Sequence, residues 1–158
     1  MGNGNDTLFL SELVGDSGKV YAFDIQQTAL KNTYEKISKN GILQHVKLIN
    51  DSHENMDMYI NDKVKLVIFN LGYLPKGDHS ITTTADTTLL GLKKALDLIE
   101  ANGIVILVVY YGHEEGNHER DALEDYIKNL NQRTYNVVKL CFANQVNSPP
   151  MLIIIEKR

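Results

Sequence analysis

Three short polar segments of this 158-residue sequence have the residue types and spacing of a nucleotide-binding site. The segment GNGND at residues 2–6 precedes an apolar segment with helical spacing, and Asp24 follows Gly4 by about 20 residues. Glycines let a backbone pass close to a ligand, a helix start offers unpaired N–H groups, and a carboxylate at that spacing accepts hydrogen bonds from ribose hydroxyls. The third segment is NDSH at residues 50–53, where Asp51 could accept from an adenine amino group while Ser52 or His53 contacts the ring.

Each of these segments also has an ordinary structural interpretation. Glycine and asparagine form turns and are often disordered at a chain start, and an aspartate after a strand commonly caps the next helix. Their joint occurrence favours a ligand site, because loops that follow parallel strands share one edge of the sheet. The first loop lacks the third glycine of an NAD-binding fingerprint, which disfavours a dinucleotide.

A fourth motif has the residues to handle an amine or a planar base. Residues 70–75 (NLGYLP) follow the apolar strand LVIFN, so Asn70 ends that strand and Tyr73 lies in the loop. The Asn70 side-chain oxygen could accept N–H bonds from an amine and aim its lone pair at a sulfonium methyl group, because in-line methyl transfer mainly needs positioning. Tyr73 could stack on a base. Alternatively, Asn70 caps the strand and Tyr73 packs in the core.

A second candidate substrate loop, YYGHEEG at residues 110–116, follows the most apolar strand. His113 is a candidate proton acceptor for an ammonium substrate, because histidine titrates near neutral pH, although it could simply end the strand. We expect no metal site. The five histidines lack the close spacing of metal ligands apart from a weak cluster of His113, Glu114 and His118.

The elements that must position these segments alternate between helices and strands. Helices are predicted at 6–14, 28–39 (with Thr28 as N-cap), 53–60, 87–100 and 119–130, and strands at 19–24, 46–49, 66–70, 103–110, 135–142 and 151–156. This pattern indicates an α/β, Rossmann-like fold with a mostly parallel sheet and a single domain over residues 1–158. The last two strands are expected to form an antiparallel hairpin, which is characteristic of methyltransferases of this fold.

Composition limits the function classes. The formal net charge of −4 argues against a strongly basic nucleic-acid coat, although it leaves room for a local basic patch. The single cysteine, Cys141, excludes an intramolecular disulfide and fits a reducing compartment. No apolar run reaches the roughly 18 residues of a membrane span. We therefore expect a cytoplasmic protein with no membrane partner.

Six segments together resemble the bacterial "putative rRNA methylase" family of YtqB-like proteins: GNGNDTLFL, FDIQ, NLGYLPKGD, ADTT, YYGHEEG and NQVNSPP. The resemblance covers essentially the whole chain. It implies a class I methyltransferase fold, S-adenosyl-L-methionine as cofactor, and a tRNA partner whose wobble 5-aminomethyl-2-thiouridine is methylated on the aminomethyl nitrogen. There are three alternatives: methylation of rRNA, methylation of a small-molecule amine, and an inactive truncated remnant. A homodimer is a further hypothesis about the partners of the chain.

The resemblance also implies roles for individual residues. Cofactor binding would fall to Gly2, Asn3, Asn5, Asp24, Gln26, Asp51, His53 and Asn70. The motifs described above remain the basis for expecting catalysis to involve Asn70, Tyr73 and His113. Substrate binding would involve Leu71, Gly72, Lys76 and Asn147.

Members of the family carry a helix and a strand ahead of GNGND, whereas Met1 directly precedes Gly2 here. That strand would be central, between the strand ending at Asp24 and the strand ending at Asn70. Without it, each unpaired buried backbone group would cost about 1–3 kcal/mol. We therefore expect the natural protein to be longer, or the gap to be filled by another segment or chain.

Overall fold

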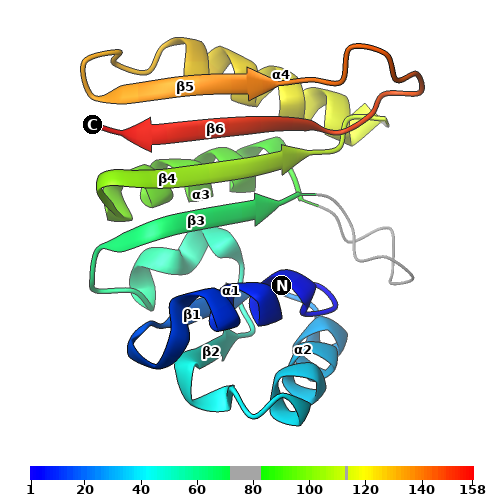
Figure 1. The fold of residues 1–158 in the computed structure, drawn as a ribbon. Helices are drawn as coiled ribbons and strands as arrows, with labels where there is room; N and C mark the ends of the chain where they lie inside the picture. The colour runs from blue at the N-terminus through cyan, green and yellow to red at the C-terminus, as the bar shows by residue number, and fades with distance from the viewer. Residues whose placement is uncertain (72–82, 113) are drawn as a thin grey trace.

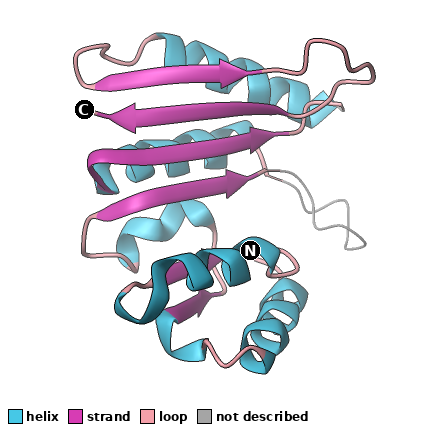
Figure 2. Cartoon of the chain, viewed as in Figure 1, coloured by secondary structure: helices cyan, strands magenta, loops and turns pink. Residues whose placement is uncertain are grey.

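The computed structural model describes residues 1–71, 83–112 and 114–158. Its α-helices and strands alternate along the chain, which confirms the predicted α/β class (Figures 1 and 2). In chain order the elements are α1 (Asn5–Val14), η1 (Gly15–Ser17), β1 (Val20–Phe23), α2 (Gln27–Lys39), η2 (Leu43–His45), β2 (Val46–Ile49), η3 (His53–Met58), β3 (Val64–Asn70), α3 (Ala85–Leu98), β4 (Ile99–Val109), α4 (Glu114–Lys128), β5 (Tyr135–Leu140) and β6 (Met151–Lys157).

Most predicted boundaries lie close to the observed ones, and two were wrong by several residues. Strand β4 begins at Ile99 because that side chain is fully buried and its residue pairs with Val64 of β3. Helix α4 begins at residue 114, not 119, since Glu115 is favourable near a helix N-terminus. The predicted N-cap of α2 was also wrong: Gln26, in extended conformation, takes that position instead of Thr28.

The strands form two separate sheets in the described residues. Strands β1 and β2 pair in parallel, and the larger sheet has the order β3-β4-β6-β5. Within it β3 and β4 are parallel, whereas β6 is antiparallel to both β4 and β5. The predicted antiparallel hairpin at the C-terminal end is therefore confirmed, and β6 lies between β4 and β5 (Figure 1).

The break between the two sheets falls at the predicted position. Strand β1 pairs only with β2 and β3 pairs only with β4 among the described residues. Strands β1 and β3 therefore each present one edge toward the break. The interior side chains of β3 are correspondingly less covered: Leu66, Val67 and Ile68 are only half-buried.

The apolar core lies mainly between the larger sheet and helices α3 and α4. Figure 1 shows both helices together on one face of this sheet. Val105, Leu107, Ile153 and Ile155 of the central strands β4 and β6 are fully buried there. The alternation of buried residues along β4 and β6 places one face of the sheet against the helices, as their apolar runs predict.

Candidate cofactor and substrate site

Asp24, at the end of β1, holds the first residues of the chain against the carboxyl edge of the small sheet. Its Oδ2 accepts from the backbone N–H of Gly2 at 2.9 Å and from the Met1 ammonium at 3.3 Å. Its Oδ1 accepts from the backbone N–H of Gln26 at 3.0 Å. Two of the predicted cofactor segments are thus in direct contact, and Oδ1 keeps capacity for a further donor such as a ribose hydroxyl.

Gly4 is required by the way the loop packs on α2. Its φ is +76°, a left-handed conformation that non-glycine residues rarely adopt, and an added Cβ would lie 2.9 Å from the Thr33 Cα. The buried Thr33 side chain also donates to the Gly2 carbonyl at 3.2 Å. The glycine loop is therefore seated on the backbone of a neighbouring helix.

The side chains of Asn3 and Asn5 point toward α2. The Asn3 Oδ1 accepts from the Asn32 amide at 3.1 Å, and the Asn5 Oδ1 accepts from the Lys36 ammonium. These two asparagines anchor the loop through their side-chain oxygens. The loop main chain is partly engaged as well, because the Gly2 N–H and carbonyl bond to Asp24 and Thr33.

Asp51 lies in a hydrogen-bonded cluster at the start of η3. It accepts from the Ser52 backbone at 2.7 Å, the Asn55 amide at 3.0 Å and the Tyr59 hydroxyl at 2.8 Å. These donors, led by Asn55, lower the pKa of the carboxyl below its usual value, so Asp51 is ionised at neutral pH. The bonds stabilise the turn, as the capping interpretation expects, and Oδ2 retains room for one more donor.

Asn50 is a positioning residue that the sequence interpretation did not single out. Its amide donates to the backbone carbonyls of Asp24 at 2.9 Å and Ile25 at 3.0 Å. It therefore fixes the loop after β2 to the loop after β1. The available signal was its place at the end of a strand, where the two parallel strands must have adjacent loops.

His53 faces α3. Its ring meets Phe69 edge-on with centroids 5.5 Å apart, and a Cβ added at Gly91 would lie 2.6 Å from its Cδ2. Burial lowers the pKa of the imidazole, an effect that a hydrogen bond with the Thr87 backbone partly offsets. Nε2 is buried and has no hydrogen-bond partner among the residues that the structure describes. His53 thus joins η3 to α3.

Asn70, at the end of β3, lies beside the first turn of α1. Its side-chain amide donates to Asp6 Oδ2 at 3.2 Å, and its residue is exposed. The structure therefore brings Asn70 next to the glycine loop, as the shared sheet edge predicts. Leu71 has its side chain in the core and its N–H bonded to the Val108 carbonyl, so its own carbonyl is what it can offer a substrate.

Two further loops meet at the same end of the larger sheet. A Cβ at Gly112 would lie 3.8 Å from Ser148, so the loop after β4 approaches the loop between β5 and β6. Asn147 and Ser148 both have positive φ, and Asn147 is exposed. Gly72, Tyr73, Lys76 and His113 lie outside the described residues, so their predicted roles stay predictions.

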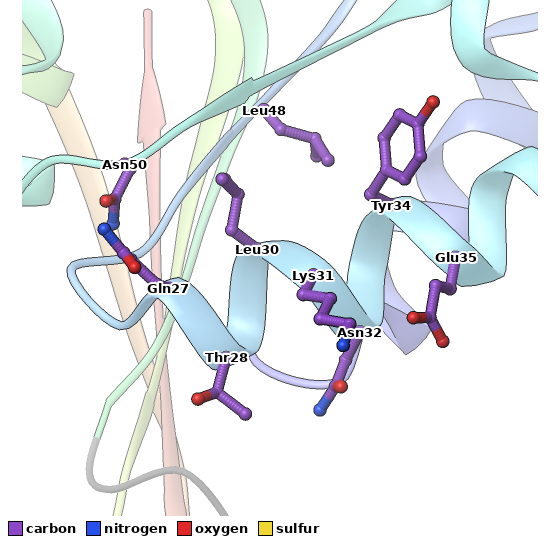
Figure 3. A pocket seen from close by; sticks show the side chains of 9 residues that line it. All are labelled: Gln27, Thr28, Leu30, Lys31, Asn32, Tyr34, Glu35, Leu48 and Asn50. Atoms are coloured by element: carbon purple, nitrogen blue, oxygen red, sulfur yellow. The ribbon is translucent and has the colours of Figure 1, made fainter.

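A cavity of about 830 Å³ lies along α2 and reaches the strand-end loops at Asn50. Figure 3 shows its lining side chains along α2 and beside Leu48 of β2, with Asn50 at one end. None of the predicted site residues that the structure describes lines it. The candidate site is therefore defined by the hydrogen-bonded strand-end loops.

Metal-binding clusters and membrane-spanning helices are both absent from the part of the chain that the structure describes. Within residues 1–71, 83–112 and 114–158, no three histidine, cysteine, aspartate or glutamate side chains gather in a way that could hold a metal ion. No helix in these same ranges has the length and apolar character needed to span a bilayer.

Comparison with known proteins now decides the family. Residues 20–156 match the family described as "Putative rRNA methylase". The chain belongs to this family. A curated relative from Arabidopsis thaliana, described as "tRNA (mnm(5)s(2)U34)-methyltransferase, chloroplastic", is 36% identical over 166 residues. That alignment covers 99% of this chain, which spans 61% of the length of the relative.

Solved structures of similar proteins confirm the fold. A "putative rRNA-methylase" from Clostridium thermocellum is 47% identical with a TM-score of 0.97, over 99% of this chain and 84% of that one. A "putative methyltransferase" from Streptococcus mutans, solved in complex with SAH (S-adenosylhomocysteine), is 42% identical with a TM-score of 0.90. The match covers 100% of this chain and 85% of that one. The predicted Rossmann-like fold of class I methyltransferases is thus confirmed.

Proposed function

We propose that this member of the family is an S-adenosylmethionine-dependent methyltransferase that methylates the aminomethyl nitrogen of 5-aminomethyl-2-thiouridine at the wobble position of tRNA. One observation carries the proposal: hydrogen bonds bring the glycine loop onto Asp24 and Asn70 onto the first turn after that loop. A cofactor loop and a polar strand end are thereby adjacent. The tRNA methyltransferase activity named for the Arabidopsis relative supports the choice of substrate.

The described residues fit the cofactor. Asp24 would accept from the ribose hydroxyls through Oδ1, with Gln26 beside it, while Asp51 would accept from the adenine amino group through Oδ2. The loop at Gly2, Asn3 and Asn5 would pass beside the methionine part. The contact of the His53 ring with Phe69 would support the loop that carries Asp51. SAH bound to the Streptococcus mutans relative supports this assignment.

Asn70 would hold the substrate amine. Its side-chain oxygen accepts an N–H, which turns the nitrogen lone pair toward the methyl group that the bound cofactor supplies. His113 would take the proton that an ammonium must lose first, and Tyr73 would stack on the base. The RNA around this base would be contacted by Lys76, Asn147, Gly72 and the Leu71 carbonyl.

The test is methyl transfer from labelled S-adenosylmethionine to tRNA that carries the 5-aminomethyl-2-thiouridine, followed by nucleoside analysis. The matched control is the same tRNA with an unmodified wobble uridine, which should accept nothing. Label in the methylaminomethyl nucleoside supports the proposal. An unlabelled tRNA, with label transferred to rRNA or to a free amine in parallel reactions, contradicts the tRNA assignment and supports one of the alternative substrates.

A further inference from the structure

Asp6 and Asn70 form a contact between two segments that are distant in sequence. The Asn70 Nδ2 lies 3.2 Å from the Asp6 Oδ2, and 64 positions separate the two residues. Asp6 is in the first turn of α1, directly after the glycine loop, and Asn70 is the last residue of β3. Both residues are exposed, so neither is held in place by burial.

The chemistry of the pair selects one orientation of the amide. A primary amide presents an acceptor oxygen on one side and a donor NH₂ on the other, whereas an ionised carboxylate can only accept. Asp6 therefore attracts the NH₂ end and turns the Asn70 oxygen away from itself. Rotated by half a turn, the same amide would place its oxygen against the carboxylate and offer donors to an incoming amine, which also has N–H groups to donate.

We propose that Asp6 is a positioning residue that fixes the Asn70 amide with its oxygen directed to the substrate amine. The inference rests on the proposed function, in which Asn70 accepts the N–H of that amine. Asp6 itself does not touch the substrate. Its contribution is to keep the acceptor end of Asn70 available in every turnover.

A merely structural role makes a different prediction. An acidic residue in the first turn favours the helix N-terminus, so its loss would weaken α1 and the loop that precedes it. That effect would lower thermal stability and affinity for SAH. A positioning role lowers kcat and leaves SAH affinity nearly unchanged. The two roles are separable by measuring kcat with the modified tRNA, the Kd for SAH and the Tm on the same samples.

Four variants make the test. Asp6→Ala removes the acceptor and should lower kcat about tenfold or more, the loss expected for one hydrogen bond to a charged group. Asn70→Asp places two carboxylates against each other and should lose at least as much. The swapped pair Asp6→Asn with Asn70→Asp should recover much of the loss, because Asn at position 6 donates to Asp at position 70, which can still accept. Glu12→Gln is the matched control, since Glu12 is an exposed carboxylate on the same helix.

The outcomes divide clearly. Loss of kcat in Asp6→Ala at constant SAH affinity, with recovery in the swapped pair and no effect of Glu12→Gln, supports the inference. An unchanged kcat in Asp6→Ala, or a swapped pair no better than Asn70→Asp, overturns the inference and leaves the proposed function standing. A wild-type protein that binds SAH but methylates no amine overturns the proposed function, and the inference falls with it.

Discussion

The two sheets of this protein differ in the interactions that surround them. Around β1 and β2 the segments are joined by polar bonds between distant residues, such as Gly2 to Asp24 and Asn50 to the carbonyls after β1. Around β3, β4 and β6 the contacts are apolar, and the largest buried side chains include Leu107 and Ile153. The polar part contains the proposed cofactor residues, whereas the apolar part supplies most of the core.

This difference has a physical consequence for how function and stability are distributed. Apolar burial contributes in proportion to area and is insensitive to exact angles, so it stabilises the scaffold. Hydrogen bonds between loops contribute little net energy but fix direction, so they preorganise acceptors for a ligand. We expect substitutions in the larger sheet to change the free energy of unfolding and substitutions in the polar loops to change ligand affinity.

The largest effect is expected in the apolar core. Leu107→Ala should lower the free energy of unfolding by about 2–5 kcal/mol, because it removes a fully buried side chain and leaves a cavity. Urea denaturation measures this. The matched control is Ile104→Ala on the same strand, where the side chain is 36% exposed and the loss should be much smaller. Equal losses at the two positions would contradict the assignment of the core to the helix-covered face.

A smaller effect is expected where η3 meets α3. Gly91→Ala should cost about 1–3 kcal/mol, because the new Cβ would lie 2.6 Å from His53 and 3.3 Å from Phe69. The double variant Gly91→Ala with His53→Ala should recover part of this loss, because it removes the ring that is in the way. If Gly91→Ala is as stable as the wild type, the close contact of His53 with α3 is wrong.

The smallest effect is a pH dependence that His53 introduces. Burial lowers the folded pKa of its imidazole, so the unfolded chain binds more protons once the pH falls below about 6.5. The contribution of neutral, buried His53 to the free energy of unfolding is complete above that pH. It is lost as the pH falls toward the pKa of the imidazole in the folded protein. His53→Gln should therefore lose less stability than the wild type between pH 7.5 and pH 5.5 in urea titrations. Exposed His118→Gln is the control, and the same slope in all three proteins would refute the interpretation.

Most of the fold was predictable because its strongest sequence signals come from residues that are close together in the chain. Continuous apolar runs identify β4 and β6, and the loop with two prolines between the last strands indicates the hairpin that the pairing confirms. The boundary between α3 and β4 was missed because Ile99 continues the helical spacing of Leu92 and Leu96, so no change of spacing marks the point where the helix ends.

The site was only partly predictable, for a physical reason. Strand-end position is enough to gather Asp24, Asp51 and Asn70 at one edge, because parallel strands align their carboxyl ends. Which side chain a given residue contacts depends on packing between segments far apart in sequence. The contact of His53 with Gly91 and the bonds of Asn50 are of this kind, so no spacing rule reveals them.

The most direct test of the polar part as a cofactor site is calorimetric titration with SAH of the wild type, Asp24→Ala and Asp16→Ala. Asp16 is a fully exposed carboxylate on η1 and serves as the charge-matched control. We expect the wild type and Asp16→Ala to bind alike, and Asp24→Ala to lose about tenfold or more in affinity, since the ribose loses a charged acceptor and Gly2 loses its anchor. Equal affinity of Asp24→Ala and the wild type would contradict the assignment of the cofactor to these loops.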